Sequence, residues 1–147
     1  VRDSIELATR FIFRLLEEGN VKLKFRDDVK MKIAYHTPCH MEKLGWAYYS
    51  IALLRSIPNI NLTVLNSQCC GIAGTYGFKK ENYETSQGIG ASLFRQIEEV
   101  AADFVATDCE TCKWQIEMST PAKVKHPISI LAEALDLEAT RKLNSDK

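Results

Sequence analysis

Apolar residues in the first part of the chain recur at the spacing of an α-helix, which predicts a helix over residues 5–18. Asp3 and Ser4 offer oxygen atoms that cap a helix start, and Gly19 offers a stop. The apolar residues that share one helical face are Ile5, Ala8, Ile12, Leu15 and Leu16. We interpret residues 21–28 as a connector that contains at most a short strand.

From residue 32 onwards the pattern changes to strand, turn and helix, and this unit then repeats. Short apolar runs rich in β-branched residues predict strands, and longer amphipathic stretches predict helices. The expected strands are 32–36, 61–66 and 104–107, with a fourth strand-turn element at 126–128; the expected helices are 41–56, 86–101, 113–118 and 129–136, followed by a polar tail.

Strands that alternate with helices indicate an α/β fold with a parallel sheet, because parallel strands need crossover connections. We therefore predict a short, mostly parallel sheet of about four strands flanked by helices in a Rossmann-like, three-layer arrangement. Residues 1–30 would form an N-terminal helix and connector, and residues 31–147 would form the main domain.

Charge balance, hydropathy and cysteine count limit the functions that this chain can have. Lys plus Arg equals Asp plus Glu at 19 each, so there is no overall basic field that would favour nucleic acid. No apolar run approaches the roughly 20 residues that cross a bilayer, and no signal peptide is recognisable at the start. These features favour the cytosol, where structural disulfides are rare. The cysteine count of five is odd, which favours metal or redox chemistry over complete internal pairing.

The five cysteines lie in three short segments, and each segment follows a predicted strand. Cys39 stands alone, Cys69 and Cys70 are adjacent, and Cys109 and Cys112 form a Cys-x-x-Cys pair. Parallel strands end at the same edge of a sheet, where ligands of such sheets bind. We therefore expect all five sulfurs, which are far apart in sequence, to converge on one pocket at the C-terminal edge of the sheet.

Three kinds of chemistry fit this arrangement. A Cys-x-x-Cys pair at the start of a helix is typical of thiol–disulfide proteins, and Asp108 is a candidate cap for that helix. A zinc site would use four sulfurs and leave one cysteine as a bystander. An iron–sulfur cluster accommodates all five, and adjacent cysteines such as Cys69 and Cys70 suit different iron atoms of one cluster.

The cysteine segments also resemble a known family. Pro38-Cys39, Cys69-Cys70-Gly71 and Cys109-x-x-Cys112 resemble the cysteine-rich "CCG" domain found in the B and D subunits of heterodisulfide reductases. The longer segments around two of these motifs look most similar to the C subunits of anaerobic glycerol-3-phosphate dehydrogenases. These segments are His36-Thr-Pro-Cys-His40 and Asn66-Ser-Gln-Cys-Cys-Gly. The resemblance runs from about residue 32 to residue 135.

This resemblance implies a [4Fe–4S] centre, cubane or non-cubane, whose ligands are Cys39, Cys69, Cys70, Cys109 and Cys112. It implies an electron-transfer domain rather than a catalytic one. The implied partners are a flavin-containing dehydrogenase subunit and a membrane-associated subunit, with membrane quinone as a candidate acceptor. The implied location is the cytoplasmic face of the cell membrane, to which the complex binds peripherally. A chain isolated in air can lose such a centre and be found in an apo form.

His36 and His40 flank Cys39 and His126 lies further along the chain, but none of the three has a spacing that demands metal ligation. We expect His40, next to Cys39, to be a solvated or hydrogen-bonded loop residue. His36 ends a strand and His126 begins the fourth element, so both are placed to approach the edge of the site. From that position a histidine can tune a cluster by hydrogen bonding.

Overall fold

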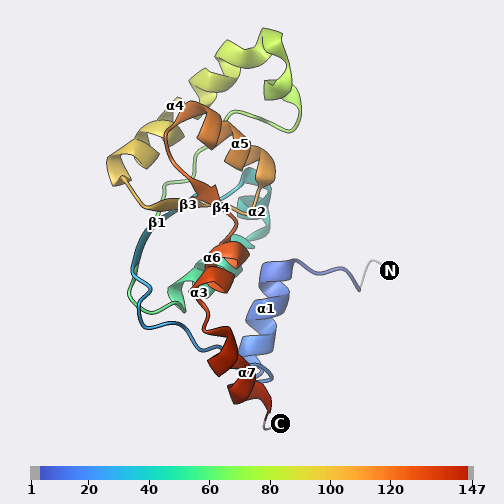
Figure 1. The fold of residues 1–147 in the computed structure, drawn as a ribbon. Helices are drawn as coiled ribbons and strands as arrows, with labels where there is room; N and C mark the ends of the chain where they lie inside the picture. The colour runs from blue at the N-terminus through green and yellow to red at the C-terminus, as the bar shows by residue number, and fades with distance from the viewer. Residues whose placement is uncertain (1–3, 146–147) are drawn as a thin grey trace.

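A computed structural model describes residues 4–145, and in this part of the chain four parallel strands form one sheet (Figure 1). The strand order is β2-β1-β3-β4, so β1 lies between β2 and β3. Ile33 of β1 is opposite Leu62 of β2 on one side and Phe104 of β3 on the other. The strands are β1 (Met31–Tyr35), β2 (Ile60–Val64), β3 (Phe104–Ala106) and β4 (Val124–Lys125). The predicted α/β class with a short parallel sheet is confirmed.

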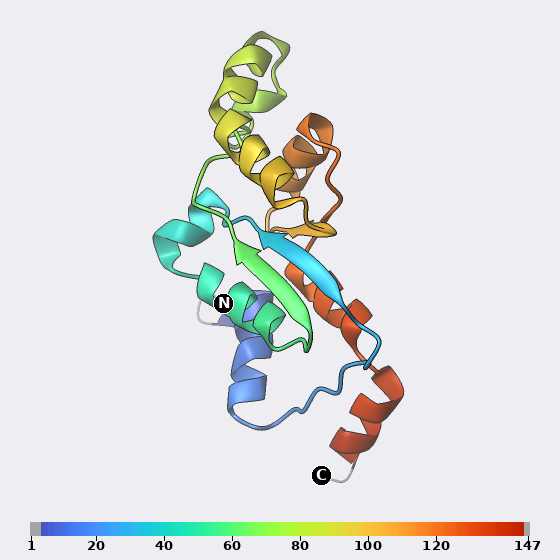
Figure 2. The same ribbon diagram turned by 90° about the vertical axis from the view of Figure 1, so that its left-hand side faces the viewer.

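Helices cover both faces of the sheet (Figure 2). Ile33, Tyr35 and Ala106 point to a core shared with α1, α3 and α6, whereas Ala34 and Val105 point to a core shared with α4 and α5. Neighbouring strand residues face opposite sides, which gives the three layers. The helices are α1 (Ala8–Glu17), α2 (Cys39–Leu44), α3 (Ala47–Arg55), α4 (Tyr83–Val100), α5 (Glu110–Ser119), α6 (Pro127–Ala134) and α7 (Leu137–Ser145). No helix within residues 4–145 has the length and hydropathy that a bilayer-spanning segment needs.

The predicted helix over 41–56 is wrong as a single element, because the chain turns at Gly45. This glycine has a φ of +67° and ends α2, after which α3 begins at Ala47. A left-handed residue at this position ends a helix at little steric cost only when it is glycine. The apolar spacing continues on both sides of the break, which is why the sequence pattern suggested one helix.

Four further elements differ from the prediction: the first helix, the connector, the fourth strand and the tail. The first helix begins at Ala8 after Leu7, so Ser4 does not cap it, and Asp3 lies outside the described residues. The connector over 21–28 forms no strand, only an isolated bridge between Phe25 and Leu135. The fourth strand is Val124–Lys125 rather than 126–128, since Pro127 already begins α6. The expected polar tail contains a helix, α7.

Helix α7 is held by hydrogen bonds from its polar side chains to the connector backbone. The Lys22 amide donates to Asn144 Oδ1 at 2.9 Å, and Asn144 Nδ2 donates to the Lys22 carbonyl at 2.8 Å. Thr140 Oγ1 likewise accepts from the Lys24 amide at 3.0 Å. The polar side chains of α7 thus take the place of a strand partner for the connector.

We predict that Asn144→Ala lowers the free energy of unfolding by about 1–2 kcal/mol, because three side chain–backbone hydrogen bonds are lost, two to Lys22 and one to Thr140. Urea denaturation measures this change, and hydrogen exchange of the Lys22 amide should accelerate. The matched control is Lys142→Ala on the same helix, which removes only an exposed ion pair with Glu138 and should cost about 0.3–0.5 kcal/mol. Equal effects of the two substitutions would contradict this role of Asn144.

Candidate functional site

The three cysteine segments meet at the point where the sheet changes winding direction. From β1 the chain reaches β2 through α2 and α3 on one face, and then reaches β3, on the other side of β1, through α4 on the opposite face. In doubly wound sheets the ligand crevice lies beyond the carboxyl ends of the strands at such a switch point. Cys39 follows β1, Cys69 and Cys70 follow β2, and Cys109 follows β3.

The structure brings the five thiols together. The Sγ atoms of Cys70 and Cys112 lie 3.3 Å apart and share a hydrogen bond. Cys109 interacts with both Cys70 and Cys112, and Cys39 interacts with both Cys69 and Cys70. The five thiols therefore form one group. Hydrogen bonds link Cys39 with Cys69 and link Cys112 with both Cys70 and Cys109, whereas Cys39 and Cys70 influence each other through charge alone. All five are free thiols.

The environment gives four of these thiols shifted pKa values, lowered for two and raised for two. Hydrogen bonding with Cys112 lowers the pKa of Cys109 to about 4 and that of Cys70 to about 7. Hydrogen bonds with Cys109 and Cys70, together with burial, raise the pKa of Cys112. Burial also raises the pKa of Cys39 to about 11, with the neighbouring Cys69 as the next cause. Binding of a metal centre would have to release the protons of Cys112 and Cys39, because the thiolate is the ligating form.

Backbone N–H groups of the Cys-Cys-Gly turn point at its sulfurs. The Gly71 amide donates to Cys69 Sγ at 3.3 Å, and the Ile72 amide hydrogen-bonds to the Cys70 thiol and lowers its pKa, after the larger effect of Cys112. The turn includes left-handed residues, with φ of +92° at Gly71 and +45° at Ala73. Amide donors stabilise negative charge on sulfur, so the turn favours thiolate or a thiolate-bound centre.

The Cys-Cys-Gly turn packs with its backbone directly against α4. A Cβ atom at Gly71 would overlap the carbonyl oxygen of Ser86, and a Cβ atom at Gly90 would lie 2.6 Å from the carbonyl oxygen of Cys70. Ser86 Oγ donates to the Gly71 carbonyl at 2.8 Å. Glycines at both contact points therefore permit the approach that carries Cys70 into the core beside Cys112.

A match to a known family decides the classification. The sequence profile described as "Cysteine-rich domain" (CCG) matches residues 33–117, which is more than half of the chain and includes all five cysteines. The chain belongs to the cysteine-rich domain family. The resemblance that the cysteine segments suggested is thereby confirmed.

Relatives of this cysteine-rich domain occur in longer proteins. The chain is 66% identical over 136 residues to the C subunit of the anaerobic glycerol-3-phosphate dehydrogenase of Escherichia coli K12, which covers 92% of the chain and 34% of that protein. It is 34% identical over 107 residues to an uncharacterised iron–sulfur protein of Methanocaldococcus jannaschii, covering 71% and 21% of the two chains. It is 32% identical over 72 residues to the D-2-hydroxyglutarate dehydrogenase of Pantoea ananatis, covering 48% and 7%. The chain spans about a third of the length of the first of these relatives.

His36 is buried within the cysteine-rich domain and connects all three cysteine segments. Its Nε2 donates to the Gln68 carbonyl at 3.1 Å, because a carbonyl oxygen only accepts, and its Nδ1 then accepts from Thr107 Oγ1 at 3.2 Å. Burial lowers the pKa of His36, which keeps the ring neutral in this arrangement. His36 thus ties the end of β1 to the segments that carry Cys69 and Cys109, a position that the sequence suggested only by its place at a strand end.

Asp108 does not cap α5, contrary to the sequence-based expectation. Cys109 occupies the N-cap position, and no side chain caps the helix. The Asp108 side chain is 3% exposed and accepts hydrogen bonds from Tyr35 Oη at 2.5 Å and Ser50 Oγ at 2.6 Å. Asp108 therefore anchors the turn before Cys109 to β1 and α3, and burial beside Asp108 raises the pKa of Tyr35. No pattern in the sequence pointed to these partners.

The other two histidines differ in role. His126 is the N-cap of α6, where its Nδ1 accepts from the Ile128 amide at 3.1 Å, and its Nε2 lies 3.8 Å from Asp108 Oδ1. His40 is exposed beside Cys39. Among residues 4–145, no group of three or more His, Cys, Asp or Glu residues is arranged to hold a single metal ion.

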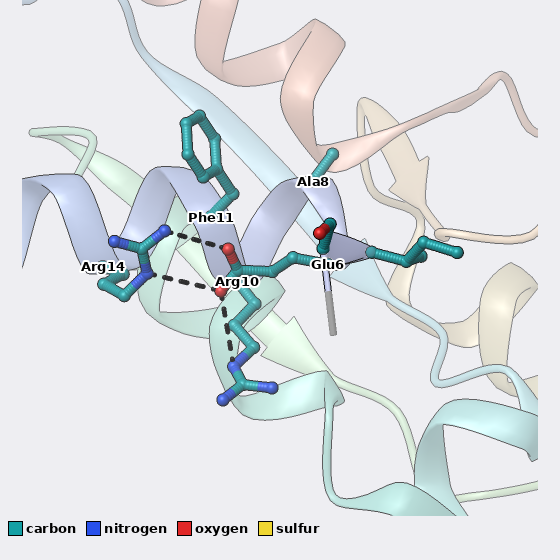
Figure 3. A pocket seen from close by; sticks show the side chains of 7 residues that line it. Glu6, Ala8, Arg10, Phe11 and Arg14 are labelled. Carbon is teal, nitrogen blue, oxygen red and sulfur yellow. Dashed lines mark hydrogen bonds and ion pairs between the residues drawn. The ribbon is translucent and has the colours of Figure 1, made fainter. Parts of the chain in front are cut away.

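A cavity of about 680 Å³ lies along α1, apart from the cysteines (Figure 3). Its two arginines, Arg10 and Arg14, both pair with Glu6, at 3.6 Å and 3.0 Å. Their charge is therefore partly neutralised within the helix and its start. No cysteine lines this cavity, so it does not compete with the sheet edge as the candidate site.

We predict that Gly71→Ala lowers the free energy of unfolding by roughly 3–5 kcal/mol, because a side chain at this position adds a backbone overlap to a left-handed φ. Urea denaturation of the reduced chain measures the loss. The matched control is Gly74→Ala, since Gly74 has a φ of +68° but no atom within 4 Å of the place that a Cβ atom would take; it should cost about 1–2 kcal/mol. A loss at Gly71 no larger than that at Gly74 would show that the contact with α4 is unimportant.

Proposed function

We propose that this cysteine-rich domain carries an iron–sulfur centre and transfers electrons within a respiratory, anaerobic glycerol-3-phosphate dehydrogenase. The observation that carries the proposal is the convergence of five thiols from three loops at the switch point of a parallel sheet. The 66% identity to one subunit of such a dehydrogenase, over 92% of this chain, supports the choice of complex. The iron–sulfur relative in Methanocaldococcus jannaschii supports the kind of cofactor.

The donor set fits a multinuclear iron–sulfur centre in kind and number. Cys39, Cys69, Cys70, Cys109 and Cys112 would hold it, either as a cubane [4Fe–4S] cluster with an extra thiolate or as a non-cubane form. Such a centre, when bound, accepts and donates single electrons. The chain's own residues contribute the amide donors of Gly71 and Ile72 at the sulfurs, which stabilise the more negative state and so raise the reduction potential.

A zinc site for subunit assembly is the first alternative, and the number of sulfurs supports it less. A structural zinc ion takes four ligands in a tetrahedron. A single zinc ion would therefore leave one of the five thiols without a role.

A thiol–disulfide protein is the second alternative. Exchange requires an accessible sulfur, and Cys109 is half-buried with a lowered pKa, as such proteins require. Its Cys-x-x-Cys partner, Cys112, is only 4% exposed and lies 3.3 Å from Cys70, which is 1% exposed. Two buried thiols in contact, with three further cysteines near them, suit a bound centre better than exchange with a protein substrate.

The wider assembly follows as part of the proposal. Electrons would come from a flavin-containing catalytic subunit and pass towards membrane quinone through a membrane-associated subunit. The complex would bind peripherally to the cytoplasmic face of the membrane. Within the chain, residues 31–147 would form the cysteine-rich domain and residues 1–30 the helix and connector that precede it.

We predict that anaerobic reconstitution with iron and sulfide yields a brown chain that contains acid-labile sulfide and gives an electron paramagnetic resonance signal. Iron content should fall in single Cys→Ser variants, most strongly in Cys70→Ser, because Cys70 is the most buried of the five cysteines and lies 3.3 Å from Cys112. The matched control is His40→Gln, which changes an exposed neighbour of Cys39 and should leave iron content unchanged.

Two outcomes would contradict the cofactor assignment. A colourless chain that excludes iron but binds one zinc tightly would favour the assembly module. A chain that binds neither metal but whose Cys109→Ser variant loses disulfide reductase activity, while Cys39→Ser retains it, would favour thiol–disulfide chemistry.

A separate measurement tests the assigned electron donor. We predict that the reconstituted chain, mixed anaerobically with the flavin-containing dehydrogenase subunit and glycerol 3-phosphate, shows the same reduced spectrum as after chemical reduction. Omission of glycerol 3-phosphate is the control. Reduction by dithionite but not by the dehydrogenase would leave the cofactor assignment intact and overturn the choice of complex.

A further inference from the structure

One hydroxyl group lies in direct contact with the five thiols. Thr111, the second residue of α5, is partly buried, and its Oγ1 lies 3.1 Å from Cys109 Sγ in a hydrogen bond. The other hydrogen bonds at the five sulfurs involve thiols or the backbone. Within residues 4–145, Thr111 is therefore the one side chain other than cysteine that hydrogen-bonds to any of these sulfurs.

The direction of this hydrogen bond follows from the charge of the sulfur. A protonated thiol and a hydroxyl can each donate, whereas a thiolate has no proton and only accepts. Hydrogen bonding with Cys112 is the main cause that lowers the pKa of Cys109 to about 4, and the Thr111 hydroxyl adds to it. Cys109 is thus a thiolate at neutral pH, and a metal-bound sulfur is a thiolate as well. In both states Thr111 is the donor.

The local structure holds this donor in place. Thr111 is β-branched, so its side chain adopts few rotamers within a helix. The Lys113 amide donates to the Cys109 carbonyl at 3.0 Å and closes the first turn of α5. Asp108, the residue before Cys109, accepts two side-chain hydrogen bonds from other elements. A donor fixed in this way is already oriented when the charge on the sulfur changes, and partial burial strengthens its interaction with that charge.

We propose that Thr111 is a positioning residue that raises the reduction potential of the iron–sulfur centre by donating a hydrogen bond to Cys109 Sγ. This inference rests on the proposed function, because it requires a centre bound through Cys109. Reduction adds one electron to the centre, and part of the added negative charge lies on the ligand sulfurs, while the hydroxyl proton stays on Thr111. A donor at a sulfur stabilises this more negative state more than the oxidised one.

Thr111 differs in one respect from the other donors at the site. The amides of Gly71 and Ile72 act in the same direction, but they belong to the backbone and are present whatever side chain follows them. The Thr111 hydroxyl makes the reduction potential depend on the identity of a single residue that is not itself a ligand.

The test compares the midpoint potentials of reconstituted chains that differ in one hydroxyl group. Thr111→Val removes the donor and keeps the shape of the side chain, and Thr111→Ser keeps the donor. The matched control is Thr85→Val, because Thr85 is exposed on α4 and its hydroxyl bonds to no sulfur. Each chain is reconstituted anaerobically with iron and sulfide, analysed for iron, and titrated reductively while the electron paramagnetic resonance signal is recorded.

We expect equal iron content in the unmodified chain and its three variants, and a lower potential in Thr111→Val alone. Loss of one hydrogen bond to a charged group should reduce the ratio of reduced to oxidised centre at a fixed potential about tenfold, which corresponds to a midpoint about 59 mV lower for a one-electron couple. Thr111→Ser should stay close to the unmodified chain, because its hydroxyl can donate to the same sulfur. Thr111→Ala, which removes the same donor, replaces Thr111→Val if that variant does not fold.

The contrary outcomes separate this inference from the proposed function. An unchanged potential in Thr111→Val, or an equal shift in Thr111→Ser or Thr85→Val, would overturn the role of the hydroxyl and leave the iron–sulfur assignment intact. Loss of iron from the variants without the hydroxyl alone would show that Thr111 is needed to hold the centre rather than to set its potential. Failure of the unmodified chain to bind iron would overturn the proposed function and this inference with it.

Discussion

The direct contact between the Cys-Cys-Gly turn and α4 is the constraint on which the site depends. At Gly71 and Gly90 two backbone segments approach too closely to admit a Cβ atom on either side. This approach carries Cys70 through the surface layer into the core formed with α4 and α5, where it meets Cys112. Since Cys69 and Cys70 both belong to this turn, its displacement would move two of the five thiols away from the other three.

Two buried polar networks hold the remaining cysteine segments in register with that turn. His36 connects Thr107 at the end of β3 to the Gln68 carbonyl beside Cys69. On the other face, Asp108 accepts from Tyr35 and Ser50 and so fixes the turn that carries Cys109. Buried charges and imidazoles are costly unless they are paired, and here each is paired with partners from a different element. The polar groups therefore specify the relative positions of the loops rather than adding net stability.

Much of this arrangement followed from the sequence alone, because it depends on local periodicity and on the geometry of parallel sheets. The alternation of strands and helices predicted the fold class, and the place of each cysteine after a strand predicted convergence. The break at Gly45 was missed because apolar spacing continues across it. Helix α7 was missed because its stabilising partners, Lys22 and Lys24, lie more than 100 residues away in sequence.

The dependence on residues distant in sequence also explains the error at the site. Asp108 looked like a helix cap because it precedes Cys109. Only the tertiary structure shows that Tyr35 and Ser50 donate hydrogen bonds to its carboxylate oxygens. Local sequence patterns thus place functional groups at the C-terminal edge of the sheet. The hydrogen-bond partners of these groups depend on which helices and strands pack together at that edge.

The cores of the protein bear on how the thiol group would take up a cofactor. Small zinc domains unfold without metal because the ligands supply most of their stabilising energy. Here Ile33, Tyr35, Leu53 and Leu54 build one core without any cysteine, and in the other core Cys70 and Cys112 pack as small hydrophobic residues beside Leu93 and Ile116. Both cores therefore bury apolar side chains that are not candidate ligands, so the fold has a source of stability besides the thiol group. A site of this kind suits an electron carrier, because surroundings that are already in place rearrange little when the charge of a bound centre changes.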